Sequence, residues 1–210
     1  MSEITKDSIK SSRVSARKIA VTGIFTAMAV VLMYLEFNLP FMPVFLKFDF
    51  SELPVLIGSF ALGPAYGIVI EFLKNLIHLP VTGTSGIGEL SNFITGSIYV
   101  FSAGFFYEKH RTRKGAIAAL LIATAVLSII AVPFNYFFTL PLYGSVAGIP
   151  MEAILGMGAA ANPLVTDKTS LVLWVFLPFN LFKGLAIGFI TFWVYKPISK
   201  LINNTYKKTR

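Results

Sequence analysis

The sequence contains no cysteine, only two histidines and few charged residues. The missing cysteine excludes disulfides, thiol catalysis and thiolate metal sites, and no histidine–carboxylate motif typical of a metal site is present. Charged residues make up 13% of the chain, against about 25% in a typical soluble domain. The chain is also 55% hydrophobic, and this combination predicts a polytopic membrane protein. At about 20 residues per span, the length leaves no room for a separate soluble domain, so an ATP-hydrolysing motor would have to be another chain.

Positive charge is abundant, and it is concentrated in three short segments. Of the 18 Lys and Arg residues, five lie in residues 6–18, four in 109–114 and five in 196–210. Basic segments beside membrane spans remain in the cytoplasm. A net charge of +8 can also indicate nucleic-acid binding, but cations that flank apolar runs favour topology anchors. We therefore expect all three segments on the cytoplasmic side, which leaves Lys47, Lys74, Lys168 and Lys183 as the unusual cations.

Apolar runs predict an all-α membrane protein with six transmembrane helices in a single domain. The expected helices lie at about 17–37, 52–62, 64–79, 88–108, 115–141 and 169–197. The run 52–80 is divided at Gly63-Pro64, because proline removes a backbone donor and restricts the residue before it.

The number of crossings supports this division. Without it, residues 109–114 would lie on the opposite side of the membrane from the N-terminus; with it, both termini and the basic loop are cytoplasmic. Loop 38–51 and segment 142–168 are then extracellular. The helix 52–62 would be only about 17 Å long, so it would need shielding by its neighbours or a thinned bilayer, whose core is usually about 30 Å thick.

Ionisable and amide side chains within the predicted spans are candidate functional residues, because they are costly in lipid. Asn180 and Lys183 are three residues apart and therefore share a helix face. Lys183 would contact a ligand, or else pair with a buried acid or extend to the interface. Asn135 would bind a ligand or make an interhelical hydrogen bond. Glu71 and Lys74, also three apart, would most simply pair with each other.

Two further groups of residues are candidates for contacts at the ends of the helices. The Gly- and Thr-rich turn 82–88 opens the helix that carries Glu89 and Asn92, which would face the outer mouth of the bundle. The first span has a stripe of small residues, which permits close approach of helices in lipid; its members are Ala16, Ala20, Gly23 and Ala27. This stripe would pack within the chain or dock a separate membrane protein.

Taken together, several motifs resemble a known family. They are Phe45-Leu46-Lys47-Phe48-Asp49-Phe50-Ser51-Glu52-Leu53-Pro54, Gly63-Pro64 through Glu71-x-x-Lys74-Asn75, Thr82-Gly83 through Gly88-Glu89-Leu90-x-Asn92-Phe93, and Pro178-Phe179-Asn180-x-x-Lys183-Gly184. In order and spacing they are similar to the substrate-binding (S) component of energy-coupling factor (ECF) vitamin transporters, specifically the riboflavin type. The resemblance covers nearly the whole chain.

The resemblance implies a multi-pass cell-membrane protein that binds riboflavin near the outer surface, with loop 38–51 as a lid. It implies no cofactor and no catalysis, with riboflavin as the transported ligand. Its implied partners are a transmembrane coupling protein, docked on the small-residue stripe, and two ATPase subunits. The implied substrate-binding residues are Asn135, Asn180, Lys183, Lys47, Asp49, Glu89 and Asn92.

Other functions stay open on sequence grounds. The extra outer cations Lys47 and Lys168 would tolerate a phosphate, so FMN or another vitamin is the alternative ligand. A membrane enzyme would need a nucleophile with a base, or a metal site, and no such constellation is apparent around His78 or His110. A purely structural membrane subunit would bind no ligand.

Overall fold

The structure is a computed structural model that describes the backbone of residues 3–207 and the side chains of residues 16–194. It is mostly helical. The α-helices are α1 (Glu3–Tyr34), α2 (Glu52–Leu62), α3 (Pro64–His78), α4 (Ile87–Lys109), α5 (Arg113–Phe134), α6 (Leu140–Ser145), α7 (Met151–Ala161), α8 (Lys168–Leu171) and α9 (Leu177–Lys207). Shorter elements are the 3-10 turn η1 (Leu79–Val81), the π-helical segments η2 (Asn135–Thr139) and η3 (Val172–Phe176), and the strands β1 (Phe37–Asn38) and β2 (Lys47–Phe48).

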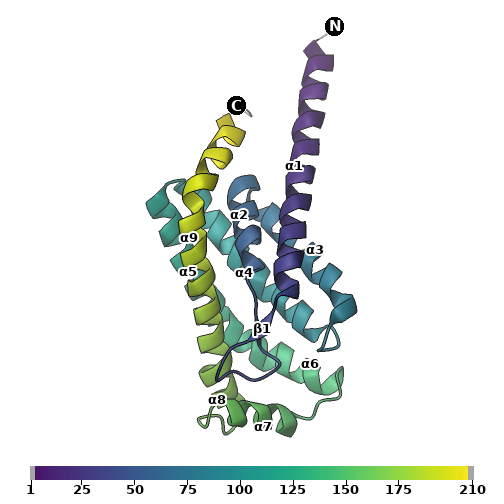
Figure 1. Cartoon of the computed structure of the whole chain (residues 1–210), viewed down its shortest axis with the longest axis vertical. Helices are drawn as coiled ribbons and strands as arrows, with labels where there is room; N and C mark the ends of the chain where they lie inside the picture. Colours follow the sequence, from purple (N-terminus) through teal and green to yellow (C-terminus); the bar gives the residue numbers. More distant parts are fainter. Residues whose placement is uncertain (1–2, 208–210) are drawn as a thin grey trace.

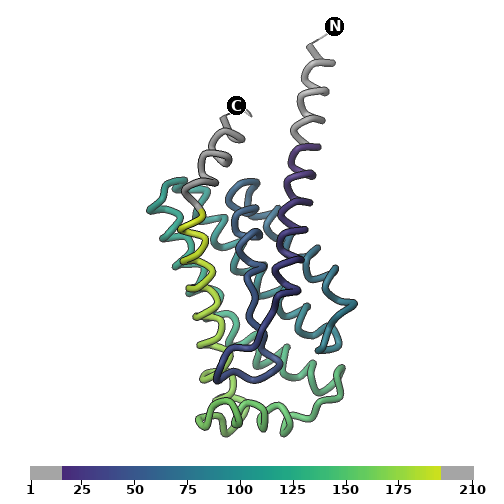
Figure 2. The backbone as a smooth tube through the Cα atoms, in the orientation of Figure 1, coloured from purple at the N-terminus to yellow at the C-terminus, as the bar shows by residue number. Residues whose placement is uncertain are grey.

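The long helices run alternately between two ends of the molecule (Figure 1). One end, here called the basic end, holds the α2–α3 turn and the α4–α5 connection. There Lys18 of α1 lies 5.5 Å from the ring centroid of Tyr66, and the Arg113 guanidinium lies 4.4 Å from that of Phe192. The other end holds the β1–β2 ribbon and α6–α8 (Figure 2). The outermost basic residues of both tails lie outside the part of the chain whose side chains are described.

Three helical segments of the described chain are long and apolar enough to cross a bilayer. They are Ala16–Tyr34, the α5–α6 rod Arg113–Ser145, and the α8–α9 rod Lys168–Val194. Each exposes large apolar side chains, among them Ile24, Ile129 and Phe189. Such surfaces suit lipid contact rather than water.

Helix α2 is buried along most of its length by α1, α3, α4 and α9. Val55, Leu56 and Phe60 form part of the main apolar core. The surrounding helices therefore shield this 11-residue element. This is the first of the two conditions under which such a short helix is expected to be tolerated in the bundle.

Gly63 ends α2 and Pro64 begins α3. Gly63 has a φ of 108°, a conformation that residues with a Cβ rarely adopt. Proline is favoured in the first turn of a helix, where its missing N–H has no intrahelical partner in any case. The chain therefore reverses direction here within one residue.

The structure contains elements that periodicity did not indicate. Segment 142–168, which lies outside the predicted helices, contains α7 and the end of α6. Loop 38–51 contains strand β2, which pairs antiparallel with β1, so the fold is not purely α; Phe37 pairs with Phe48 and Asn38 with Lys47. Helix α1 begins at Glu3 rather than near residue 17.

Candidate ligand pocket

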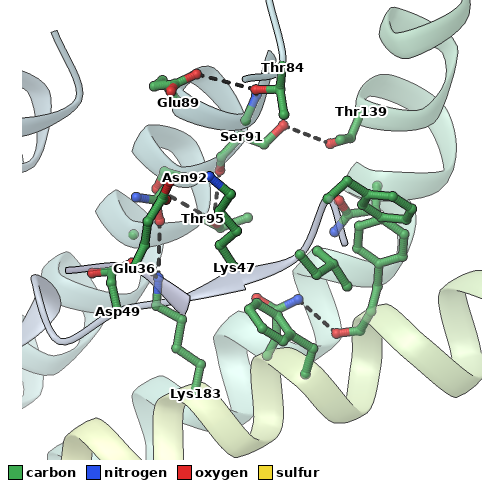
Figure 3. Close-up of a pocket in the computed structure, with 18 of the residues that line it drawn as sticks. Glu36, Lys47, Asp49, Thr84, Glu89, Ser91, Asn92, Thr95, Thr139 and Lys183 are labelled. Atoms are coloured by element: carbon green, nitrogen blue, oxygen red, sulfur yellow. Dashed lines mark hydrogen bonds and ion pairs between the residues drawn. The ribbon is translucent and has the colours of Figure 1, made fainter. Parts of the chain in front are cut away.

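A pocket with a volume of about 130 Å³ lies toward the end of the bundle opposite the basic end. Its walls come from the loop between β1 and α2, from α4, from the α5–η2 junction and from α9. Apolar lining is supplied by Met33, Phe45, Leu46, Leu127, Phe176 and Phe179, and the charged side chains of Glu36, Lys47, Asp49 and Lys183 lie together on one side (Figure 3). A flat ligand with one polar edge suits such a lining. Ligand sites usually measure about 300–1,000 Å³, so a vitamin-sized ligand requires the lining to open.

Lys183 projects from α9 into the polar side of the pocket (Figure 3). Its Nζ lies 3.4 Å from Asp49 Oδ2, 3.5 Å from Glu52 Oε1 and 3.3 Å from Asn92 Oδ1. The pairing of Lys183 with buried acids, one of the sequence-based interpretations, is therefore confirmed. Lys183 also lines the pocket, and its contact with a ligand stays a prediction. The long distances leave its donors able to turn toward a ligand.

Behind Lys183 the polar contacts close into a ring that joins α2, α3, α4 and α9. We call it the polar ring; its members are Lys183, Glu52, Lys74, Glu71, Asn75 and Asn92. Glu52 Oε1 contacts both ammonium groups, at 3.5 Å from Lys183 and 2.8 Å from Lys74. The pocket lysine is thus linked through one carboxylate to a lysine in the core.

The inner half of the polar ring is fully buried. Lys74 Nζ lies 3.0 Å from Glu71 Oε1, and Glu71 accepts a hydrogen bond of 3.0 Å from the Asn75 amide. The Asn92 amide then donates to Asn75 Oδ1 at 3.2 Å. The second carboxylate oxygens of Glu52 and Glu71 have no hydrogen-bond partner among the described residues. Lys74 is therefore the main group that compensates two buried carboxylates.

Gly96 of α4 makes room for these carboxylates. A Cβ at this position would lie 2.6 Å from Glu71 Cδ and 3.2 Å from Glu52 Oε1. Only a residue without a side chain allows α4 to approach the acids this closely.

Asp49 is fixed just before α2 by the backbone. Its Oδ1 accepts a hydrogen bond of 2.7 Å from the Ser51 N–H, and Lys74 donates to the Ser51 hydroxyl at 2.8 Å. Burial raises the pKa of Asp49, but the charges of Lys183 and Lys74 and the Ser51 hydrogen bonds outweigh it and bring the pKa below the ordinary value. Asp49 therefore lies ionised beside the pocket.

Asn135 and Asn180 occupy equivalent positions in two helices, each within a Pro-Phe-Asn tripeptide. Each side chain is buried, lines the pocket and donates to the carbonyl four residues earlier, to Ala131 at 2.7 Å and to Phe176 at 2.8 Å. An amide has two donor hydrogens and an acceptor oxygen, so each retains groups for a ligand. A π-helical segment, a distortion that is frequent at functional sites, begins at Asn135, and another ends at Phe176, whose carbonyl accepts from Asn180. The sequence contained this repeat, which would have indicated that the two asparagines act together.

Glu89 is already engaged by its surroundings. It receives hydrogen bonds from Thr82 at 2.7 Å and from Thr84 at 3.4 Å, and it lies 3.0 Å from His78 Nδ1. It lines the pocket opposite Lys183 (Figure 3). In this arrangement Glu89 mainly fixes the turn between α3 and α4 against the pocket.

The loop between the two strands covers one side of the pocket. Lys47 forms an ion pair with Glu36 across the ribbon, and Asn38 holds the loop by donating to Val44 O at 2.9 Å. Farther along, the Phe45 ring stacks on Phe176 with centroids 6.0 Å apart. The loop is therefore anchored by an ion pair and a hydrogen bond beside the strands and by the aromatic contact of Phe45.

The stripe of small residues lies on the outer surface of α1. All four members are exposed, and a Cβ at Gly23 would meet nothing within 4 Å. The opposite face of α1 is buried through Thr22, Thr26, Ala29 and Met33. Packing within the chain, one of the two sequence-based readings, is therefore wrong.

The structure brings the seven predicted site residues to one pocket. Sequence reasoning missed Glu52, which links the two lysines, because its position in the first turn of α2 looks like ordinary helix capping. The Glu71–Lys74 pairing is present, as part of the larger ring. No group of three or more metal-ligating side chains occurs among the described residues.

An apolar helical bundle with a pocket of placed polar groups defines a membrane protein of the solute-binding type. Residues 17–195 match the family described as ECF transporter, substrate-specific component. The chain belongs to this family, whose members are transport subunits rather than enzymes.

Two relatives and one solved structure are similar to the chain over most of its length. The chain is 31% identical over 186 residues to the riboflavin transporter RibU of Staphylococcus aureus (strain TCH60), covering 89% of this chain and 92% of the relative. It is 32% identical over 177 residues to the riboflavin transporter FmnP of Bacillus subtilis (strain 168), covering 81% and 86%. A solved structure of the S component of a bacterial ECF transporter superposes with a TM-score of 0.71 at 28% identity, covering 90% of this chain and 98% of that one.

Proposed function

We propose that this chain binds riboflavin in the pocket between α4, α5 and α9 and delivers it for ATP-driven uptake by partner subunits. The observation that carries the proposal is the convergence of Asn135, Asn180 and Lys183 on one cavity that also has an apolar wall with aromatic side chains. It is supported by two relatives that are named as riboflavin transporters and match most of the chain.

The chemistry of the pocket suits an isoalloxazine ring. This ring system is flat and largely apolar, with an imide edge that needs both donors and acceptors. The amides of Asn135 and Asn180 supply both kinds of group, while Lys183 and Asn92 are placed for ring carbonyls or ribityl hydroxyls. Asp49, Lys47 and Glu89 then complete the polar rim.

FMN is a poorer fit than riboflavin. The pocket is lined by the carboxylates of Glu36, Asp49, Glu52 and Glu89 and by two ammonium groups, those of Lys47 and Lys183. Both lysines already have acidic partners, so a phosphate would meet a surplus of negative charge. Lys168 lies against the Tyr136 ring at 4.1 Å and is not part of the lining.

The proposed topology has six crossings, with the basic end in the cytoplasm of a multi-pass cell-membrane protein. The positive-inside rule and the positions of Lys18 and Arg113 at one end of the bundle support this orientation. The pocket then opens outward, and loop 38–51 is its lid. The exposed stripe on α1 docks a transmembrane coupling protein, which also carries two ATPase subunits.

Flavin fluorescence tests the assignment. The purified chain should quench added riboflavin, and FMN should compete poorly. The double variant Asn180→Ala/Lys183→Ala should abolish riboflavin quenching, while the control Lys168→Ala, outside the pocket, should bind as the parent does. Unchanged binding in the double variant, or no binding by the parent, would refute the proposal.

A further inference from the structure

A second cavity lies between α5 and α9 on the outer face of the bundle. It has a volume of about 410 Å³ and an almost wholly apolar lining that includes Leu121, Leu185, Phe189 and Phe192. We call it the α5–α9 groove. Both helices belong to segments that are long and apolar enough to cross a bilayer, so the groove faces the hydrocarbon region.

Two glycines line the hollow, and at Gly184 a Cβ would lie 2.7 Å from Thr124 Cγ2, so α5 and α9 pack closely there. Gly184 and Gly188 lie one helical turn apart and form its floor. At Gly188 a Cβ would meet only ordinary contacts, with Tyr99 Oη at 3.5 Å and Leu120 Cβ at 3.6 Å. The space over Gly188 is therefore left open although a side chain would fit.

Positive charge lies at one end of the groove. Arg113 lies beside it, with its guanidinium 4.4 Å from the ring centroid of the groove residue Phe192. The neighbouring Lys114 is exposed, and both residues belong to the first turn of α5, whose N-terminus favours an anion. An apolar trough that ends in cations matches a molecule with an acyl chain and an acidic headgroup.

We infer that the α5–α9 groove binds an anionic phospholipid, with an acyl chain over Gly188 and the phosphate beside Arg113 and Lys114. Basic pockets between transmembrane helices on the cytoplasmic side hold anionic headgroups in this way. The site is separate from the vitamin pocket except at Gly184, which lines both cavities. Lipid binding at this position would fill the hollow and fix α9, the helix that carries Lys183.

Trp193 provides a direct readout. It is 64% exposed, and its ring lies 6.2 Å from Phe189 and 6.3 Å from Phe192. The chain contains two tryptophans, so Trp174→Phe leaves Trp193 as the single reporter. This protein would be reconstituted in phosphatidylcholine vesicles containing a few mole per cent of either brominated phosphatidylglycerol or brominated phosphatidylcholine.

The brominated anionic lipid should quench Trp193 more strongly than the brominated zwitterionic lipid at the same mole fraction. Arg113→Gln should lower this preference about five-fold, and Gly188→Leu should lower quenching by the anionic lipid while riboflavin binding persists. Lys168→Gln, at the other end of α8–α9, is the matched charge control and should change nothing. Equal quenching by the two lipids, or a preference unaffected by Arg113→Gln, would overturn the inference. If Gly188→Leu fails to fold, the Arg113 variant alone decides.

Discussion

Lys74 is the residue on which the buried charges depend most, and its replacement gives a sharp test of the structure. Its side chain is fully buried between Glu52 and Glu71, at 2.8 and 3.0 Å. Lys74→Met keeps the length of the side chain but leaves two buried carboxylates without their main compensating charge. Removing one partner of a buried ion pair costs about 3–5 kcal/mol. For a chain of this size, such a loss lowers the melting temperature by about 6–20 °C.

The exposed pair Lys47–Glu36 supplies the control. Lys47→Met removes the same charge from a pair whose side chains are 39% and 21% exposed, and an exposed pair contributes about 0–1 kcal/mol. Thermal unfolding of the ligand-free protein in one detergent should therefore separate the two variants. Adding Glu71→Gln to Lys74→Met should restore part of the loss, because it removes one of the two acidic groups that Lys74 contacts. Equal melting temperatures for Lys74→Met and the parent would refute the ionic account of the core.

Two further predictions concern acid sensitivity and orientation. The pKa of Asp49 is lowered from its ordinary 3.8, so the stabilising pair with Lys183 is fully present above that pH and is lost as the pH falls through the lower pKa of the folded state. Asp49→Asn should therefore reduce the fall in melting temperature seen below about pH 4. An unchanged dependence of the melting temperature on acid pH would contradict this. Because the chain has no cysteine, Thr112→Cys and Val146→Cys can be labelled singly in whole cells with an impermeant maleimide; only Val146→Cys should react, and labelling of Thr112→Cys would reverse the proposed topology.

The sequence predicted the helical class because long apolar runs and a helix-breaking Gly63-Pro64 pair are local signals. It also indicated Asn180 and Lys183, since amide and ammonium groups are conspicuous in an apolar helix. Helix α7 was missed because its Gly- and Ala-rich sequence lacks a clear apolar face.

The polar ring could not be predicted, because it depends on the relative rotation of four helices. Glu52 and Lys183 are 131 positions apart, and neither local sequence indicates that the two side chains are in contact. The close approach of α4 at Gly96 also depends on tertiary packing. Periodicity assigns residues to faces of a helix, but it does not say which faces of different helices come together.

The closed form of the polar ring restricts how the protein can change over evolutionary time. Each member contacts a neighbour on either side, so replacing one charged residue leaves the charge of its neighbour buried without a partner. A tolerated replacement must therefore be accompanied by a compensating replacement at the neighbouring position. Positions 52, 71, 74 and 183 should therefore change together, whereas Asn135 and Asn180, which lie outside the ring, are free to diverge with the solute.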